Sequence, residues 1–291
     1  MNLENEYERK QLSLQLKNEI DEFCVLTYNT GPRSHLGASE IGHNCSRYLW
    51  MKFRWLFYKV HDGSQYRLFQ RGHFEEPRFR GYAEGIGFTI QEFDDAHKDE
   101  VDKGKKQIRI AACKGHFGGS VDGIGFRSDV GYVLAEWKTQ GIGKQGKNFI
   151  KLEAEGVKKY KPVHWAQMSI YGYKLGLQYA LYIAVNKTTD ELHVEFVKLD
   201  WELGKDLEKK AEFIIFAETA PNGIGCSASY WECSYCDAKE LCFSNAEPLV
   251  NCRSCKYSTP VDNSEWGCKH WNAVIPKDAI PNACPEWESI F

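Results

Sequence analysis

Residues 117–138, FGGSVDGIGFRSDVGYVLAEWK, decide the fold of this chain. Glycines interrupt the first half, a Ser-Asp-Val-Gly turn follows, and an apolar run then ends in Glu136-Trp137-Lys138. This pattern predicts a β-hairpin. Because side chains alternate along a strand, Glu136 and Lys138 share one face and Trp137 lies on the other. The first strand of the hairpin is expected to bring Asp122 beside Glu136.

The patterns on both sides of the hairpin predict an α/β protein. Helices are expected over 2–23, 39–58 with Ser39 as N-cap, 64–84 with a kink or break at Pro77, 146–155, 163–174 and 201–218. Further strands are expected over 87–93, 107–112, 179–186 and 192–199. This order predicts a mixed central sheet flanked by helices.

Composition places the chain among globular proteins. Hydrophobic residues make up 43% of the 291 residues, and the net charge of −3 argues neither for nor against nucleic acid. No run approaches the roughly 18 to 20 apolar residues that span a bilayer, so we expect no membrane partner. The first ten residues are charged and lack a secretory signal, which predicts a cytoplasmic location, in a bacterial host if the protein is viral.

Asp122 and Glu136 are two carboxylates that repel one another unless a cation lies between them. Mg²⁺, or Mn²⁺ in its place, suits such oxygen ligands. A bound ion of this kind lowers the pKa of its water and stabilises charge on a phosphoryl oxygen. Lys138 on the same face would orient the attacking water or neutralise developing charge. The alternative is that all three are ordinary solvent-facing charges on an edge strand.

In order and spacing, these residues resemble the core motif of the PD-(D/E)XK nucleases. The similarity is greatest to the branch with lambda exonuclease, the RecB nuclease domain and the RecB-like CRISPR adaptation nucleases. Asp122 and Glu136-Trp137-Lys138 match the motif, whereas Val121 replaces its proline. The resemblance implies the restriction-endonuclease-like fold over residues 37–242.

Two flanking segments resemble further motifs of this branch. Residues 72–76 are similar to the G-x-x-x-(E/H) helix, which implies that Glu76 is another metal-directed group. Gln167 and Tyr171 match Q-x-x-x-Y and, being four apart, share a helical face. The resemblance thus implies Mg²⁺ ligation by Glu76, Asp122, Glu136 and the Trp137 carbonyl, with Lys138, Gln167 and Tyr171 completing the catalytic set.

Candidate substrate contacts lie elsewhere in the chain. The segment around Ser39 resembles the part of lambda-type exonucleases that approaches a terminal phosphate, with a simple N-cap as the alternative. Arg47 would pair with phosphate bidentately, or form a structural ion pair. The basic stretches 103–109 and 144–161 would follow the phosphate backbone, or be a solvated surface.

Eleven cysteines are many for a cytosolic chain, where disulfides are rare, so clustered cysteines favour metal binding. Cys233-x2-Cys236-x5-Cys242 lacks a nearby fourth ligand, and Cys45 is the candidate. This set resembles the iron–sulfur staple of RecB-like nucleases, which implies a 4Fe–4S cluster that ties distant parts of the chain together. A structural zinc in the same four thiolates is the alternative.

A second cysteine set follows in the region 246–291, where periodicity disappears. Cys252-x2-Cys255 with Cys268 and Cys284 suits tetrahedral zinc, and His270 is an alternative to one of the later thiols. The competing interpretation is a loosely structured tail with free thiols. We therefore predict a nuclease domain over 1–245, stapled by the iron–sulfur cluster, and a zinc-binding module over 246–291.

Together these observations predict a Mg²⁺-dependent DNA exonuclease of phage or bacterial recombination, repair or DNA processing. Its partners would be linear DNA with a free end and a second copy or a recombination protein. The first alternative is a structure-specific or integration-linked endonuclease. The second is a non-catalytic DNA-binding or protein-interaction module, because a fold does not fix function.

Overall fold

The computed structural model describes residues 4–94, 107–141 and 148–291. A five-stranded sheet with strand order β2-β5-β6-β7-β8 lies at its centre. The strands are β2 (Thr89–Gln91), β5 (Gly123–Arg127), β6 (Gly131–Gln140), β7 (Tyr179–Asn186) and β8 (Leu192–Lys198). β6 and β7 run parallel, and the other three neighbouring pairs are antiparallel. The predicted mixed sheet is therefore confirmed.

The predicted hairpin is formed by β5 and β6, which pair from Gly123–Ala135 to Arg127–Gly131. The first strand of this hairpin, expected as one strand over 116–126, is divided into β4 and β5, however. β4 (Phe117–Ser120) belongs to a second sheet of order β1-β4-β3, with β1 (Leu36–Gly37) and β3 (Arg109–Ala112). The chain therefore passes from one sheet to the other through Val121 and Asp122.

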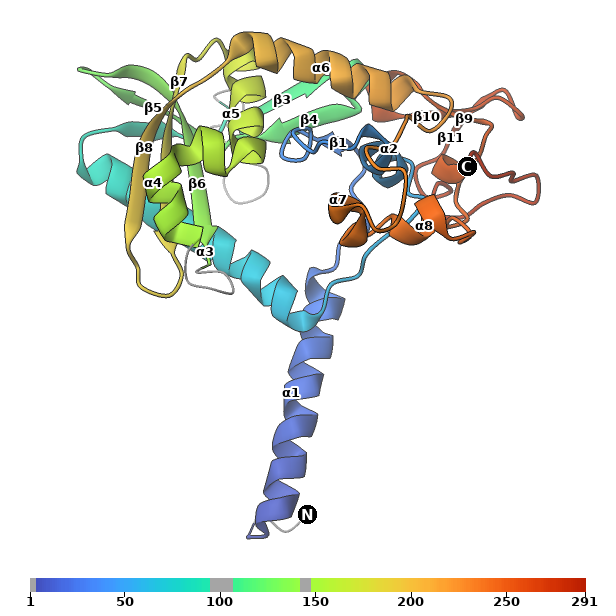
Figure 1. Cartoon of the computed structure of the whole chain (residues 1–291), viewed down its shortest axis with the longest axis horizontal. Helices are drawn as coiled ribbons and strands as arrows, with labels where there is room; N and C mark the ends of the chain where they lie inside the picture. Colours follow the sequence, from blue (N-terminus) through green and yellow to red (C-terminus); the bar gives the residue numbers. More distant parts are fainter. Residues whose placement is uncertain (1–3, 95–106, 142–147) are drawn as a thin grey trace.

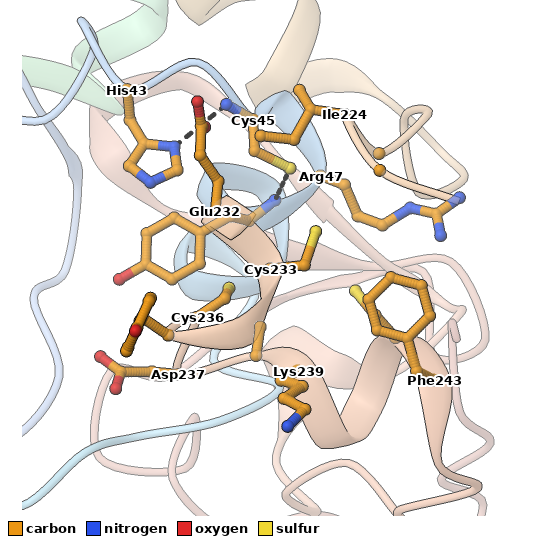
Figure 2. A pocket seen from close by; sticks show the side chains of 16 residues that line it. His43, Cys45, Arg47, Ile224, Glu232, Cys233, Cys236, Asp237, Lys239 and Phe243 are labelled. Atoms are coloured by element: carbon orange, nitrogen blue, oxygen red, sulfur yellow. Dashed lines mark hydrogen bonds between the residues drawn. The ribbon is translucent and has the colours of Figure 1, made fainter. Parts of the chain in front are cut away.

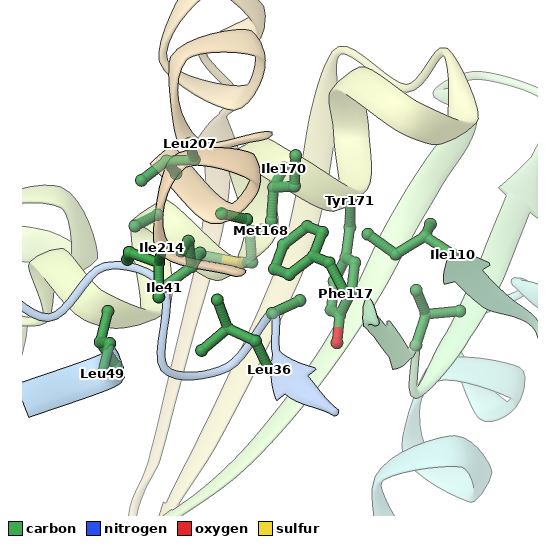
Figure 3. Packing of buried hydrophobic residues seen from close by; sticks show 14 of the residues in the cluster. Leu36, Ile41, Leu49, Ile110, Phe117, Met168, Ile170, Tyr171, Leu207 and Ile214 are labelled. Atoms are coloured by element: carbon green, nitrogen blue, oxygen red, sulfur yellow. The ribbon is translucent and has the colours of Figure 1, made fainter. Parts of the chain in front are cut away.

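The described part of the chain contains six longer helices, most of them packed around the sheets (Figure 1). They are α1 (Glu6–Tyr28), α2 (Ser46–Phe53), α3 (Gly63–Gly85), α4 (Asn148–Tyr160), α5 (Pro162–Leu175) and α6 (Trp201–Phe216). α3 covers one face of the central sheet, where Phe79 stacks on Trp137 with ring centroids 6.0 Å apart. On the other face, α5 and α6 enclose the main core (Figure 3). α1 projects away from this body.

Two expected helices differ from the structure. The helix expected from Ser39 begins at Ser46, and Cys45 is its N-cap, with its sulfur accepting from Tyr48 N at 3.4 Å. Ser39 instead lies in a turn, so it does not cap a helix. α3 continues through Pro77, so a break there is wrong.

The C-terminal region contains little regular secondary structure, as its composition predicted. It contains α7 (Trp231–Ser234), α8 (Lys239–Phe243) and an antiparallel sheet of β9 (Ser258–Pro260), β10 (Trp266–Cys268) and β11 (Ala273–Ile275). Trp266 and Ile280 are buried in the main core, so this region is packed onto the rest of the chain. None of the described helices has the length and apolarity needed to cross a membrane.

Candidate active site and cysteine clusters

Asp122 lies at the junction of the two sheets, one residue before β5 begins. The pairing of Gly123 with Ala135 brings Asp122 level with Glu136. Its Oδ2 accepts a hydrogen bond from the backbone amide of Trp137 at 2.7 Å. The hairpin thus places the two carboxylates next to each other, as the alternation of the sequence predicted.

Glu136 is completely buried on β6. Its Oε1 forms an ion pair with the Lys138 ammonium on the same strand face. Its Oε2 is buried without a hydrogen-bond partner among the described residues. Burial raises the pKa of Glu136 to about 7; Lys138 opposes this rise and Asp122 adds to it. A buried carboxylate oxygen with no partner is costly unless a cation or a proton compensates it.

Lys138 carries the positive charge of the site. Burial lowers its pKa, but the carboxylates of Glu136 and Asp122 more than offset this effect, so its pKa is raised overall. Lys138 therefore stays an ammonium at neutral pH. It is placed to stabilise negative charge beside the two carboxylates.

Glu76 approaches from α3. Burial raises its pKa, Asp122 raises it further, and His73 and Lys138 lower it. His73 Nδ1 lies 3.1 Å from Glu76 Oε1. The electrostatic influence of Asp122 and Lys138 shows that Glu76 belongs to the same charged neighbourhood.

Gln167 and Tyr171 lie on α5, and both are buried. The Tyr171 hydroxyl donates to the Ser120 carbonyl at 2.9 Å, two residues before Asp122. Burial raises the pKa of Tyr171, and the charge of Glu136 adds to the rise, whereas a hydrogen bond with Gln167 lowers it. A Cβ at Gly119 would lie 2.4 Å from the Tyr171 hydroxyl oxygen, so only glycine allows this approach. The Q-x-x-x-Y pair therefore supports the segment that carries Asp122.

Ser39 lies two residues after β1, which pairs in parallel with the edge of β4 opposite to β3. Its Oγ accepts from Arg33 Nη1 at 3.3 Å, and the Arg33 guanidinium lies across Gly37. His35 is next to these groups: burial lowers its pKa to about 4, with help from Arg33, Arg109 and Arg253. Positive charge is thus concentrated around the segment that contains Ser39.

The cysteines of the first set converge on one pocket, although Cys45 is remote in sequence from Cys233, Cys236 and Cys242 (Figure 2). Burial raises the pKa of Cys236, and the thiols of Cys45 and Cys233 add to the rise. Asn44 Nδ2 donates to Glu232 Oε1 at 3.3 Å, which joins the same two parts of the chain. The predicted grouping of these four cysteines therefore exists in the fold.

Arg47 also lines this cysteine pocket. Its Nε donates to the Pro221 carbonyl at 2.7 Å, and it lowers the pKa of Cys242, which burial raises. A substrate contact by Arg47 stays a prediction, because these observed contacts belong to the cysteine pocket.

The second set of four cysteines converges as well. Cys252, Cys255, Cys268 and Cys284 line one pocket in the C-terminal region. Burial raises the pKa of Cys252, and the three other thiols of the set raise it further. His270 contacts the rings of Tyr257 and Trp271. All eleven cysteines are free thiols.

Within residues 4–94, 107–141 and 148–291, no three or more His, Cys, Asp or Glu side chains are grouped closely enough to hold a metal ion as they stand. This applies to the carboxylates and to both cysteine sets. The chemistry of the residues nevertheless fits cations. The carboxylate centre has an unpartnered buried oxygen, and each thiol set has four soft donors around one pocket.

The basic stretches are only partly described. Lys103, Lys105, Lys106, Lys144 and Lys147 lie outside the described residues. Within α4, Lys151, Lys158 and Lys159 are exposed, and Lys158 Nζ lies 4.2 Å from the centre of the Trp165 ring.

Two features of the site were missed from the sequence. Arg33 has no motif of its own, and its role depends on β1 pairing with a strand that lies far along the chain. His164 and Tyr182 form a partly buried hydrogen bond of 3.0 Å, and the charge of Lys138 lowers the pKa of His164 further than burial alone. The sequence does not show that His164 and Tyr182 lie near the site, because this follows from the pairing of Tyr182 with Glu136 across β6 and β7.

No protein-family model matches the chain, and no curated protein matches it. Among solved structures, LHK-Exo in complex with dAMP is 15% identical, with a TM-score of 0.41, over 62% of this chain and 86% of that one. LHK-Exo, an alkaline exonuclease from Laribacter hongkongensis, has 16% identity and a TM-score of 0.38 over 63% and 87%. SSO0001 has 16% identity and a TM-score of 0.40 over 76% and 94%. With TM-scores below 0.5 the likeness is loose, and function is inferred below from this chain's own residues.

Proposed function

We propose that this chain is a metal-dependent nuclease that hydrolyses phosphodiester bonds from the end of a linear DNA. The observation that carries the proposal is the convergence of Asp122, Glu136 and Lys138, where one buried Glu136 oxygen has no hydrogen-bond partner among the residues that the structure describes. Buried carboxylate oxygens with a purely structural role usually accept hydrogen bonds, whereas catalytic carboxylates have oxygens available to bind a ligand.

The carboxylates fit Mg²⁺ or Mn²⁺ because all the available donors are oxygens. Glu76, Asp122 and Glu136 would hold the ion, with the Trp137 carbonyl as a backbone ligand. A bound ion of this type supplies an acidified water and charge stabilisation at the phosphoryl group. Lys138 holds its proton and places an ammonium beside the scissile phosphate. Tyr171 keeps the Asp122 segment in position through the Ser120 carbonyl, and Gln167 hydrogen-bonds Tyr171.

A free DNA end is the proposed substrate because of the positively charged segment around Ser39, which follows β1 and so lies along β4, the strand that leads to Asp122. Arg33 and Ser39 offer a guanidinium and a hydroxyl, which together suit a terminal phosphate. Arg109 lies opposite Ser120 in the β3–β4 pair, close to the approach to Asp122. The exposed lysines of α4 would bind backbone phosphates in a salt-dependent way.

We further propose that the two cysteine pockets hold different metals. Cys45, Cys233, Cys236 and Cys242 would bind a 4Fe–4S cluster, and Cys252, Cys255, Cys268 and Cys284 would bind zinc. The convergence of both sets supports metal binding, while the choice of metal follows the sequence resemblance for the first set and the C-x2-C opening for the second. Metal bound to the first set would close a long loop of chain and so stabilise the fold.

The test is cleavage of end-labelled linear DNA and covalently closed circular DNA by anaerobically purified protein, with Mg²⁺, Mn²⁺ or EDTA. Loss of the linear form alone, abolished by EDTA, is the expected result. Cutting of the circle would replace the exonuclease with an endonuclease. Absence of cleavage with both ions, in protein that retains its cysteine-bound metals, would overturn the nuclease proposal.

A further inference from the structure

Arg253 occupies an unusual environment for a guanidinium. It is 1% exposed and lies between Cys252 and Cys255, in the first turn of the C-terminal cysteine module, residues 246–291. Its guanidinium carbon lies 4.6 Å from the centre of the Phe53 ring, 4.4 Å from Trp55 and 4.5 Å from Trp266. Three aromatic faces stabilise a desolvated cation in place of a carboxylate.

The hydrogen bonds of Arg253 reach out of the module. Nη1 donates to the Ser34 carbonyl at 3.1 Å and, more weakly, to the Arg33 carbonyl at 3.5 Å. Trp55 Nε1 donates to the same Arg33 carbonyl at 2.9 Å. Nε and Nη2 of Arg253 have no hydrogen-bond partner in the described part of the chain. The guanidinium's hydrogen bonds there therefore all go to the carbonyls of Arg33 and Ser34.

The segment held in this way leads directly to the proposed end-binding residues. Two residues beyond Ser34, β1 begins, and Leu36 N and Ala38 N donate to the carbonyls of His116 and Gly118 at 2.9 and 2.8 Å. Arg33 itself reaches back to Ser39. The segment from Arg33 to Ser39 is thus attached to β4 on one side and to the cysteine module on the other.

We propose that Arg253 is a positioning residue, through which the C-terminal cysteine module fixes Arg33 and Ser39 for binding the terminal phosphate of DNA. This inference rests on the proposed nuclease function for its last step, but not for the anchoring of the segment. It gives the module a part in substrate binding although it lies apart from the central sheet (Figure 1).

The first test is hydrogen exchange in the metal-loaded protein, which needs no catalysis. In Arg253→Met, the amides of Leu36 and Ala38 are expected to exchange at least about tenfold faster, while the amides of β6 and β7 keep their protection. Lys256→Ala is the matched control: Lys256 follows the same turn, is exposed, and its ammonium contacts Glu288 and Tyr257 within the module. Unchanged exchange at Leu36 and Ala38 in folded Arg253→Met would overturn the inference.

The second test separates positioning from general damage. With DNA that carries a terminal phosphate, Arg253→Met is expected to raise KM by about tenfold or more and to leave kcat within a few-fold, while hydroxyl-ended DNA shows little change. Arg253→Lys keeps the charge and one donor and is expected to restore part of the affinity. An equal fall in kcat for both ends would contradict positioning.

Trp55→Phe covers the case in which Arg253→Met does not fold. It keeps the ring against Arg253 but removes the Nε1 donor to the Arg33 carbonyl. Faster exchange at Leu36 and Ala38 is expected again, and its absence would count against the anchoring. If the wild type cleaves no DNA but the exchange result holds, the nuclease proposal fails and the anchoring of residues 33–39 stands.

Discussion

Asp122 and Trp137 are joined by a 2.7 Å hydrogen bond from the backbone amide of the second to the carboxylate of the first. This bond closes the end of the β5–β6 ladder, where the chain crosses from the small sheet to the central one. Because Trp137 lies between Glu136 and Lys138, its amide fixes Asp122 beside both charged side chains. One Asp122 oxygen is thereby used for orientation.

Asp122→Asn is expected to fold normally and to lose activity. The amide oxygen of Asn accepts from Trp137 N as the carboxylate does, but the negative charge next to Glu136 is gone. We expect cleavage to fall by about two orders of magnitude or more, with an unfolding midpoint close to that of the wild type. Cleavage within a few-fold of wild type, measured on end-labelled DNA, would show that Asp122 is not at the reaction centre.

Lys138→Ala distinguishes a nuclease from a DNA-binding module. Removing the ammonium is expected to lower kcat by about a hundredfold or more, while the affinity for DNA in the absence of divalent cations changes little. Lys198→Ala, an exposed lysine at the end of β8, is the control and should cleave normally. An equal loss of DNA affinity in Lys138→Ala and Lys198→Ala would indicate that Lys138 contributes only positive charge to DNA binding.

Tyr171→Phe tests whether α5 positions the catalytic segment. The change leaves the Ser120 carbonyl without its partner, which should cost about 1–3 kcal/mol of unfolding free energy and lower kcat. Tyr173→Phe, on the same helix but half-buried, should alter neither quantity. A stable Tyr171→Phe protein with normal kcat would remove this residue from the catalytic set.

Binding of Mg²⁺ should depend on pH through Glu136. Its pKa is raised to about 7 by burial, so the folded protein binds a proton that the unfolded chain has already lost above the ordinary pKa. The metal-free protein is therefore expected to lose unfolding free energy as pH rises from 4.5 to about 7. Mg²⁺ must displace the same proton below pH 7.

Calorimetric titration in two buffers with different ionisation enthalpies measures this proton. We expect release of about one proton per Mg²⁺ near pH 6 and almost none well above pH 7, with tighter binding at the higher pH. Glu136→Gln should abolish the pH dependence together with most of the affinity. Equal affinity on both sides of pH 7 would contradict the raised pKa.

The sequence predicted strand β6 well because local alternation determines it. Glu136 and Lys138 are two apart on one strand, whose residues 133–137 are buried, so their common face follows from the period of the strand. The preceding strand, expected as one element over 116–126, is divided into β4 and β5 for a non-local reason. Gly119 and Ser120 pair with β3 and contact Tyr171, and neither partner is visible from the pattern around them.

Ser39 illustrates the same limit. A serine before an apolar, helical pattern predicts an N-cap, but the helix starts seven residues later at Ser46. The turn over residues 38–42 is held by pairing of β1 with β4 and by Arg33, which a local reading of the sequence does not contain. For the cysteines, spacing pointed to residues that do line one pocket, Cys45 and the three later thiols, while their role as metal ligands stays a prediction.

Cys45→Ser is expected to destabilise the protein more than the loss of one small side chain would. Serine can still cap α2 in place of the sulfur, so the variant tests the pocket, where Cys45 is the one cysteine that comes from the N-terminal part of the chain. If the four thiolates hold a cluster, the variant loses iron and its visible absorption, and the thermal unfolding midpoint falls by several degrees or more. Zinc in the same pocket would give the same destabilisation without colour.

The control is Cys226→Ser, which changes an exposed thiol outside both pockets and should keep metal content and stability. Elemental analysis of anaerobically purified protein then assigns the metals: iron lost in Cys45→Ser with zinc retained, and zinc lost in Cys268→Ser with iron retained. Because the two pockets use separate thiols, loss of both metals in one variant would mean that the pockets fold as a unit. Wild-type protein that contains neither metal, and a Cys45→Ser protein as stable as the Cys226→Ser control, would refute the metal assignment for the first pocket.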